Sequence, residues 1–424
     1  MESETTRRDV GADHAPLSPD HAADPYPFYV RARREAPVFY SPAVDAWVVC
    51  RHEDAAAVLR DHRRFVSAVL AARARQHTPE ALAILASTPI VERNLLTVDP
   101  PEHTRLRGAL MRVLSASRVA ALEPRIRGLC DGVIDRFEPR GGGDFMRLFA
   151  HPLPIVVIGS LLDLPEADFP SLEAWADDLV DLMTGELPAD AQAPCARSIV
   201  AMDRYVFDLA ERRGREPGAD LASQLFSAAE TGQAPLRTGE VAAMLQILVA
   251  AGFETTIRLL GSCMRSLLTE RRHWEAIVDD PSRIPAVVEE VLRFDGPILS
   301  TLRRATEDVD LGGTTIPAGA LVMVVVSSAN HDEAVFPDAE TFHPDRAAPV
   351  GHLAFGQGVH FCAGAVLARL ETRVALERLS RRLPSLRLAA GHRVSYRPNL
   401  VNRSLEHLHV EWNDRLRPAS DHLA

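Results

Sequence analysis

The chain has 424 residues, of which 46% are hydrophobic and 25% charged, so it can bury a large core. Its formal net charge of −11 argues against non-specific binding to nucleic acid. The five cysteines are scattered and form no CxxC pair, which argues against a disulfide framework or a structural zinc site and fits a reducing cytoplasm.

The beginning of the chain is polar and then rich in strand-forming residues. Residues 1–23 contain no apolar stretch of the signal-peptide kind, and we expect them to form a disordered tail. The stretch APVFYSPAVDAWVVCR places β-branched and aromatic residues on both sides of a turn, which predicts a pair of strands. The apolar runs are too short to span a bilayer, so we expect a cytoplasmic protein that does not bind membranes.

Helical patterns dominate the rest of the chain. The stretches RVAALEPRIRGLCDGVIDRF and LASQLFSAAE repeat apolar residues at helical spacing. Residues 239–270 are apolar on most faces, which predicts a long, buried central helix. Strands are expected from Leu311 onward, and a last helix over Gly364 to Leu383. We therefore predict one domain over residues 24–424, mainly α with a smaller β portion.

Cys362 lies on a glycine-rich loop immediately before this last helix. A lone cysteine is most often buried and inert. However, Gly356, Gly358 and Gly364 remove side chains around it, so a flat partner can approach the backbone. The free amides at the start of the helix favour an anion and should lower the pKa of the thiol. These features predict a reactive or metal-ligating cysteine, but they do not by themselves identify a cofactor.

The loop sequence FGQGVHFCAG resembles, position for position, the heme-binding loop FGxGxHxCxG of the cytochrome P-450 family. The resemblance implies that Cys362 is the proximal thiolate ligand of heme b, that Phe355 packs near the sulfur, and that His360 points to a heme propionate. Gly356 and Gly364 belong to the same cofactor-binding loop. Further segments match the family in the expected order from about Asp24 to Val410.

The segment AGFETT, residues 251–256, lies within the predicted central helix. Small residues in a buried helix usually serve packing, but Glu254 is costly to bury without a partner or a task. A threonine beside the small Ala251 and Gly252 can bond back to a helix carbonyl and loosen the helix. In the family this segment crosses the distal heme face, which implies that Thr255 and Glu254 deliver protons to dioxygen.

Two further segments carry cationic side chains. DPPEHTRLR places His103 and Arg107 on one helical face, and Arg303 begins the RxA of LRRATEDVDL. Alone these residues would mean little, because exposed histidine and arginine are common. Cationic donors on one face suit a carboxylate. The resemblance implies that these three residues, with His360, bind the two heme propionates.

The segment EEVLR carries Glu290 and Arg293 three residues apart, which alone would be read as a surface ion pair. In the family this ExxR pair is buried behind the heme and has a structural role. Its usual third partner is an arginine in a later loop, but the sequence FPDAETF has Thr341 at that position. His352 or Arg346 could replace the missing arginine, and the sequence does not decide between them.

Substrate contacts are expected from variable segments over the heme. The candidates are the segment Val66 to Val91 and six apolar residues, each of which could equally be ordinary core: Leu248, Ala251, Ile298, Leu299, Leu400 and Val401. The segment Leu182 to Arg197, with two prolines and a glycine, suits a mobile lid between two helices.

The resemblance implies a heme-thiolate monooxygenase that inserts one atom of O2 into an apolar small molecule. The reaction would be a hydroxylation or epoxidation that tailors a secondary metabolite. Electrons would come from NAD(P)H through a ferredoxin reductase and a ferredoxin that docks near Cys362, at arginines such as Arg107 and Arg369. The alternatives are a peroxide-driven heme-thiolate peroxygenase and, with less support, a non-catalytic heme-binding protein.

Overall fold

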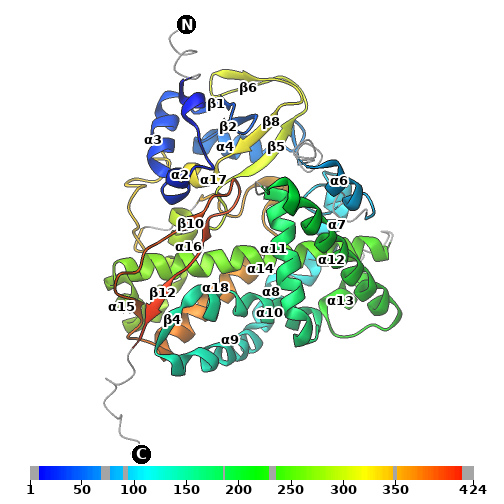
Figure 1. The fold of residues 1–424 in the computed structure, drawn as a ribbon, viewed down its shortest axis with the longest axis vertical. Helices are drawn as coiled ribbons and strands as arrows, with labels where there is room; N and C mark the ends of the chain where they lie inside the picture. The colour runs from blue at the N-terminus through cyan, green and yellow to red at the C-terminus, as the bar shows by residue number, and fades with distance from the viewer. Residues whose placement is uncertain are drawn as a thin grey trace, which may run out of the picture.

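A block of helices carries a smaller β-rich region at one end of the molecule (Figure 1). The computed structural model describes residues 9–67, 77–88, 94–184, 187–228, 235–346 and 351–412. The chain leaves the β-rich region for the helices and returns to it with β5 (Thr301–Ala305) and β8 (Leu321–Val324) before it ends beside the helical block. The predicted architecture, mainly α with a smaller β portion, is confirmed.

The largest sheet has five strands in the order β1-β2-β8-β5-β3. β1 (Val38–Ser41) and β2 (Ala46–Val49) form the antiparallel hairpin that the sequence predicts, while β3 (Phe65–Val66) closes the other edge. β2 runs parallel to β8, which is antiparallel to β5. The helices α3 (Tyr26–Glu35) and α4 (His52–Arg60) lie beside this sheet (Figure 1).

The N-terminal segment is ordered from residue 9 onward, contrary to the predicted disordered tail. Residues 9–13 are helical and α2 spans Pro19–Ala23, while residues 1–8 lie outside the described residues. The buried His14 lies 2.8 Å from the Ser41 hydroxyl and 3.1 Å from the Tyr29 hydroxyl. Polar composition misled here, because this short segment gains its order from the sheet against which it packs.

Three smaller sheets complete the β portion. β6 (Val309–Leu311) pairs with β7 (Thr314–Ile316), which confirms the strands expected after Leu311. β12 (His409–Glu411) lies between β4 (Gly142–Asp144) and β9 (Arg387–Leu388), and β10 (Tyr396–Arg397) pairs with β11 (Ser404–Leu405). These strands tie the end of the chain to the helical block.

The central helix α14 spans Thr238–Thr269, in agreement with the predicted range. It begins at a capping interaction in which the backbone N–H of Arg237 donates to the Glu240 carboxylate at 2.9 Å. The helix is long and apolar enough to cross a membrane, but 78% of that stretch is buried in the structure. It is therefore the core helix of the helical block, as its apolar faces predict.

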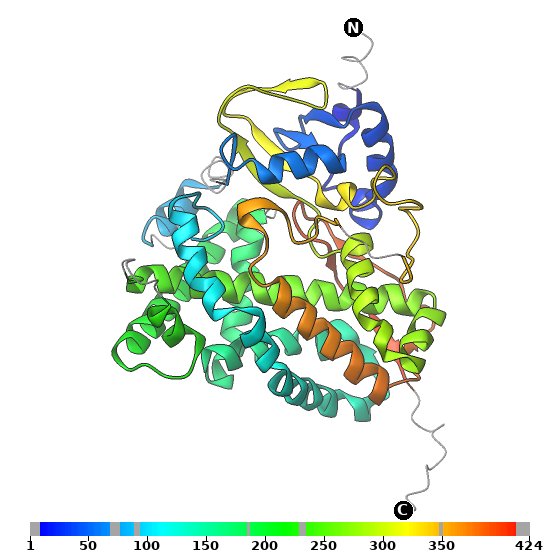
Figure 2. The same ribbon diagram turned by 180° about the vertical axis from the view of Figure 1, so that it is seen from behind.

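The other helices surround α14. α10 (Pro152–Leu162), α11 (Phe169–Thr184), α12 (Ala189–Arg215), α16 (Ile284–Asp295) and α18 (Ala365–Arg382) all contact it. Figure 2 shows α18, in orange, following the cysteine loop and lying beside the cyan helices. The remaining helices are α6 (Pro79–Leu85), α7 (Glu102–Val113), α8 (Ala116–Ala121), α9 (Glu123–Phe137), α13 (Leu221–Ser227), α15 (Arg272–Asp279) and α17 (Val326–Ala329).

The segment predicted to form a mobile lid, Leu182 to Arg197, is mostly helical. α11 continues to Thr184, and α12 begins at Ala189 and accommodates Pro194 in its interior. Residues 185–186 lie outside the described residues. The thiol of Cys195 donates to Asp178 of α11 at 3.2 Å, so the two helices are also joined by side chains. The connection between the helices is therefore short: Pro188 immediately precedes α12, and Pro194 lies within it.

Candidate active site

Cys362 lies between a 3-10 turn at Gly358–His360 and the start of α18. Its backbone N–H donates to the carbonyl of Phe355 at 2.8 Å, which folds the loop back on itself. Gly358 has a φ of 73°, and a Cβ at this position would lie 2.5 Å from the Leu59 carbonyl oxygen. Glycine is therefore required where the loop packs against the end of α4.

The environment of the Cys362 thiol differs from the prediction. Burial raises the pKa of this thiol, and this effect outweighs the lowering by the backbone N–H groups of Gly364 and Ala365 and by Arg107 and Arg369. The helix terminus acts in the expected direction but does not dominate. Because a bound metal cation deprotonates a ligating thiol, the four stabilising groups suit a thiolate that forms on metal binding.

Phe355 belongs to the same loop as Cys362, and its carbonyl accepts the hydrogen bond from the Cys362 backbone. Its ring is stacked under the guanidinium group of Arg369, 4.4 Å from the ring centroid. Arg369 also forms a bidentate ion pair with Glu289, with N–O distances of 2.6 and 2.8 Å. The loop is thus fixed to α18 and α16 by an aromatic ring and an ion pair, which keeps Cys362 in place.

The four cationic residues that the sequence singled out come together from three elements. His103 and Arg107 project from α7, Arg303 from β5, and His360 from the cysteine loop. The ring centroids of His103 and His360 are 4.2 Å apart. Burial, followed by the charges of His360 and Arg107, lowers the pKa of His103 to about 4. We call these four residues the cation cradle.

The cation cradle lacks anionic partners for most of its members. Both ring nitrogens of His103 are buried without a hydrogen bond. The buried guanidinium group of Arg303 donates to neutral oxygens of Thr301 and Leu302, at 3.2 and 2.7 Å, and burial lowers its pKa. Among the residues that the structure describes, His360 is the one member that contacts a carboxylate, that of Asp99 at 3.2 Å, a residue that the sequence analysis missed. A group with two carboxylates beside a metal, as in heme, fits these donors.

The opposite wall of the site is formed by α14. A cavity of about 280 Å3 is lined there by Ala251, Glu254 and Thr255, and it extends to Arg303 and His360 of the cation cradle. The hydroxyl of Thr255 donates to the Ala251 carbonyl at 2.7 Å, and that of Thr256 to the Gly252 carbonyl at 2.8 Å. The predicted bonding of threonine to the helix backbone is confirmed.

Glu254 is buried but is not isolated. Its carboxylate pairs with Arg258, whose Nε donates to the Ser404 hydroxyl at 3.0 Å. Burial and then a hydrogen bond with Glu254 raise the pKa of Asp177, on α11, to about 9. Burial opposes ionisation of Glu254 as well, but Arg258 and the bond from Asp177 lower its pKa. Two carboxyl groups therefore share one proton beside one guanidinium group.

Asp177 was missed by the sequence analysis. The stretch WADDLVDLM carries three acidic residues in an amphipathic helix, which is an ordinary surface pattern. Only Asp177 hydrogen-bonds to Glu254, whereas Asp178 accepts from Cys195 and Asp181 pairs with Arg397 at 2.8 Å. Spacing alone does not show which of the three faces α14.

The cavity lining differs from the predicted set of six residues. Ala251 and Val401 line the cavity, but the other four lie outside its lining. Leu248 packs on the helical core and Leu400 on the core beneath the large sheet, while Ile298 and Leu299 use their backbones to pair with residues 402 and 401. Leu248 and Leu400 are each next in the chain to a lining residue, Ile247 and Val401, and Ile298 and Leu299 pair through the backbone with the lining residues Asn402 and Val401.

The lining residues that the sequence analysis missed come largely from α11 and β5. They are Leu96, Thr97, Leu179, Val180, Met183, Ile247, Ala250, Thr301, Leu302 and Asn402. Of the predicted segment Val66 to Val91, Ser67 lines the cavity, while residues 68–76 and 89–91 lie outside the described residues. Most of this lining is aliphatic, with polar groups at a few points.

The ExxR pair is buried behind the site. Arg293 Nη2 and Glu290 Oε1 are 2.7 Å apart, and both side chains are at most 1% exposed. Arg346 supplies the third group: its Nε lies 3.4 Å from Glu290, and it donates to the carbonyl of Thr341 at 3.3 Å. His352 instead contacts Glu289 at 3.2 Å. Arg346 therefore occupies the role of the missing arginine.

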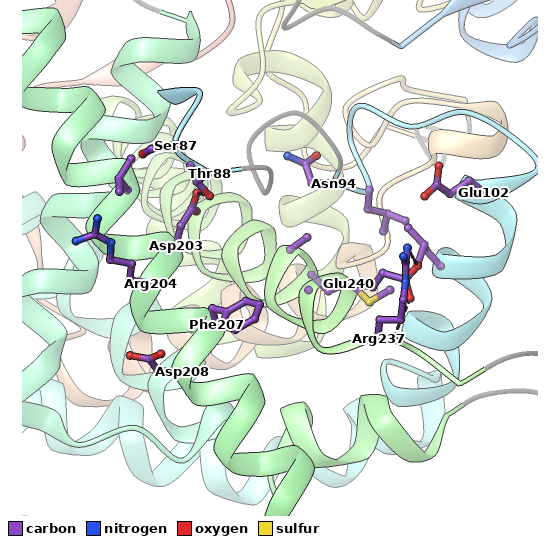
Figure 3. A pocket seen from close by; sticks show the side chains of 16 residues that line it. Ser87, Thr88, Asn94, Glu102, Asp203, Arg204, Phe207, Asp208, Arg237 and Glu240 are labelled. Carbon is purple, nitrogen blue, oxygen red and sulfur yellow. Dashed lines mark hydrogen bonds and ion pairs between the residues drawn. The ribbon is translucent and has the colours of Figure 1, made fainter. Parts of the chain in front are cut away.

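A second cavity, of about 480 Å3, lies between α7, α12 and the start of α14 (Figure 3). Asp203, Arg237 and Glu240 in its lining already have partners. Asp203 accepts from the Thr88 hydroxyl at 2.5 Å and also from Gln246, and Glu240 pairs with Arg237 at 2.9 Å. Figure 3 shows these two groups on opposite sides of the cavity. They hold neighbouring elements together and none of them adjoins Cys362.

Comparison with known proteins agrees with this arrangement. A family model described as cytochrome P450 matches residues 203–384. The chain is 38% identical over 398 residues to cytochrome P450 107B1 of Saccharopolyspora erythraea, covering 92% of this chain and 95% of that protein. It is also 38% identical over 412 residues to the monooxygenase PikC of Streptomyces venezuelae, covering 95% and 94%.

Solved structures give the same result. The fold is similar to that of cytochrome P450 CREJ in complex with (4-ethylphenyl) dihydrogen phosphate, with a TM-score of 0.89 and 32% identity over 95% of this chain and all of that chain. The heme domain of a P450 from Tepidiphilus thermophilus matches with a TM-score of 0.89 and 29% identity, over 97% of this chain and 99% of that chain. The chain is therefore a member of the cytochrome P450 family and a monooxygenase.

Proposed function

We propose that the chain binds heme b through Cys362 and hydroxylates or epoxidises an apolar small molecule that belongs to a secondary metabolite. The observation that carries this proposal is the position of the cavity. It lies between the cation cradle and the Thr255 segment of α14, with Glu254 in its wall. A substrate in this cavity would lie beside both the cofactor site and the proposed proton donors.

Heme ligated by a thiolate supplies the activation of O2. The protein's own residues orient the cofactor, exclude water and deliver protons. His103, Arg107, Arg303 and His360 would hold the two propionates, and Cys362 would bind the iron. Thr255 is held against the Ala251 carbonyl, which places its hydroxyl on the cavity surface where a proton is needed. Glu254 lies one residue away and would supply that proton.

The substrate class is supported by the cavity and by relatives. Leu179, Val180, Met183 and Ile247 give the cavity apolar walls. Among the relatives are a 6-deoxyerythronolide B hydroxylase of Saccharopolyspora erythraea and a mycinamicin IV hydroxylase/epoxidase of Micromonospora griseorubida. An apolar substrate with few polar groups, such as a macrocyclic metabolite, fits both observations.

The proposed electron donor is a ferredoxin, reduced by NAD(P)H through a separate reductase in the cytoplasm. A groove of about 410 Å3 lies on the surface beside the cysteine loop, lined by Val119, Val366, Arg369 and Arg373 among others. Val366 is 43% exposed at its edge. The groove is also lined by Glu289 and Glu123, which pair with Arg369 and Arg373, so an acidic protein partner would compete with them for these arginines. If an Arg373→Gln variant accepts electrons as fast as the parent at low salt, this groove is not the docking site.

A ligand screen tests the proposed function. Purified protein reconstituted with heme should show a substrate-induced shift of the ferric Soret band with macrocyclic or other apolar metabolites. The same compounds should then be converted with NAD(P)H, a reductase and a surrogate ferredoxin. Turnover with hydrogen peroxide at equal or higher rates would favour the peroxygenase. Absence of any Soret shift and of any product would favour the non-catalytic heme-binding alternative.

A further inference from the structure

The second cavity, of about 480 Å3, is separate from the active-site cavity (Figure 3). No described residue lines both of them, and its volume is in the range of small-molecule sites. One turn of the chain contributes to both linings: Asn94 and Leu95 line the second cavity, and Leu96 and Thr97 line the active-site cavity. The backbone N–H of Thr97 donates to the Asn94 carbonyl at 3.0 Å, which closes this turn. A molecule in the second cavity would therefore not occupy the substrate site.

Asp203 places a buried carboxylate in the wall of the second cavity. The residue is 2% exposed, and no cation among the described residues pairs with it. Its two oxygens accept hydrogen bonds from neutral groups, the Thr88 hydroxyl at 2.5 Å and the side-chain amide of Gln246. Burial raises the pKa of Asp203 to about 6, so the group is mostly ionised at neutral pH. The wall therefore holds a negative charge that the described residues do not neutralise.

A second hydrogen-bond acceptor lies beside this carboxylate. Gln246 is fully buried, and its Oε1 has no hydrogen-bond partner, while the Nε2 of the same amide donates to Asp203. A carboxylate can accept about four hydrogen bonds, and that of Asp203 accepts two. Both groups can only accept further hydrogen bonds, so they favour a ligand that donates hydrogen bonds and carries positive charge. A protonated amine has both properties.

The rest of the lining indicates what this amine is attached to. Leu95, Leu106 and Met244 are buried apolar residues of the wall. Phe207 lies four residues after Asp203 on α12, and its side chain is 41% exposed although it lines the cavity. Residues at this spacing share a helix face, so a cation at Asp203 would lie near the aromatic ring. The lining therefore suits a molecule with an apolar body and one cationic group.

The other charged residues of the lining leave the charge of Asp203 uncompensated. They are Glu102 on α7, Arg204 and Asp208 on α12, and Arg237 and Glu240 at the start of α14. The pKa of Asp203 is set by burial and by its two hydrogen bonds, and not by these charges. Arg237 is held by Glu240 in an ion pair at 2.9 Å, and Arg204 is exposed to solvent. With four carboxyl groups and two guanidinium groups, the lining favours a cation over an anion.

We propose that the second cavity binds an apolar small molecule that carries a protonated amine, with the ammonium group paired to Asp203. Binding is reversible, and no covalent bond forms or breaks. A primary or secondary amine has a further N–H for the Oε1 of Gln246. This ligand is distinct from the substrate of the active site, so the proposal does not depend on the reaction that occurs there.

Calorimetric titration of the heme-loaded protein tests the proposal with two compounds of the same shape. N-methyl(cyclohexylmethyl)amine is protonated at about pH 8, whereas cyclohexylmethyl methyl ether is neutral. An azole that ligates the iron is bound first, so its Soret band reports any displacement from the active-site cavity. One amine should bind per chain, and the ether should bind about tenfold more weakly, because it cannot pair with a carboxylate. Displacement of the azole, or equal affinity for the two compounds, would overturn the proposal.

The matched variants are Asp203→Asn and Asp190→Asn, both on α12. Asparagine keeps the shape of Asp203 but removes its charge, so the amine affinity should fall about tenfold while the ether affinity stays unchanged. Asp190 is exposed and lies outside the lining, so Asp190→Asn should bind the amine like the parent. The proposal fails if Asp203→Asn keeps the parental amine affinity, or if Asp190→Asn loses as much.

The amine affinity should also depend on pH through Asp203. The pKa of this carboxyl group is raised to about 6, so it is protonated progressively as the pH falls below that value. The amine remains protonated throughout, and its affinity for the parent should therefore fall about tenfold between about pH 8 and about pH 5. Asp203→Asn should show a flat profile over the same range. A flat profile in the parent would show that the amine binds elsewhere.

Should Asp203→Asn fail to take up heme, Phe207→Ser carries the comparison. The Phe207 side chain is 41% exposed, so its removal should leave the fold intact. Loss of the ring should weaken the binding of both compounds about fivefold, because each buries apolar surface against it. The parental pH profile then tests the carboxylate independently. Unchanged affinities in Phe207→Ser would reject the second cavity as the binding site.

Discussion

The two sides of the active-site cavity differ in whether their buried polar groups have partners of opposite charge within the protein. In the cation cradle, no carboxylate of the described residues contacts the buried side chains of His103 and Arg303. On the α14 wall, Glu254 and Asp177 share one proton and one guanidinium group. The cradle is therefore unfavourable until an anionic cofactor binds, whereas the α14 wall is already neutralised. One side suits a permanent anionic ligand, and the other holds Glu254, which we propose as the proton donor.

The largest effect is expected from removing the thiolate on the cradle side. Cys362→Ala should abolish the strongly red-shifted absorption maximum of the dithionite-reduced protein under carbon monoxide, because that maximum requires a thiolate ligand. Cys195→Ala, which removes the thiol that donates to Asp178 of α11, should keep the maximum. A Cys362→Ala protein that retained the maximum would contradict the assignment of Cys362 as the iron ligand.

In the buried ExxR pair, each charge already has a partner of opposite charge, so removing one partner should lower the free energy of unfolding. Arg293→Ala should destabilise the heme-free protein by about 3–5 kcal/mol, because it leaves the buried Glu290 carboxylate with the more distant Arg346 and the backbone N–H of His343. Arg346→Ala should cost about 1 kcal/mol, since its contact is longer and more exposed. Urea unfolding of the two variants measures both values. Equal losses would show that Arg346 is a full member of the pair.

Removing Arg303 from the cation cradle should not lower the stability of the heme-free protein, in contrast to removing Arg293. Arg303→Met should leave the heme-free protein as stable as the parent or about 1 kcal/mol more stable, because it removes a buried charge that has only neutral partners. The same change should weaken heme retention about tenfold, since a charged hydrogen bond to a propionate is lost. Unfolding and heme transfer to apomyoglobin measure the two effects. Loss of stability without heme would mean that Arg303 is mainly structural.

The smallest effect concerns pH. The pKa of His103 is about 4 in the folded protein, below its ordinary value of 6.5, so the unfolded chain binds more protons between these values. The heme-free protein should therefore lose stability as the pH falls from about 6.5 to about 4, by about 1 kcal/mol from this residue. His103→Gln should flatten that part of the pH profile. Heme should also flatten it, because its propionates would raise the pKa of His103.

The sequence alone indicated the local structures that depend on short-range pattern, while the cofactor and the residue roles were implied by the family resemblance. The FGQGVHFCAG loop, the AGFETT segment and the long central helix were identified from residues that are adjacent in the chain, where glycine, cysteine and apolar spacing restrict the backbone directly. The His103–Arg107 spacing placed both groups on one face of α7 for the same reason. Local geometry leaves few alternatives for such motifs.

Tertiary structure decided every pairing between distant segments. It selected Arg346 over His352 as the partner of Glu290, turned Leu248 and Leu400 away from the cavity, and brought Asp177 to Glu254. It also determined that burial outweighs the helix terminus at Cys362. These outcomes depend on which helix face packs inward and on how much water each group loses, and both are fixed only when the elements are assembled.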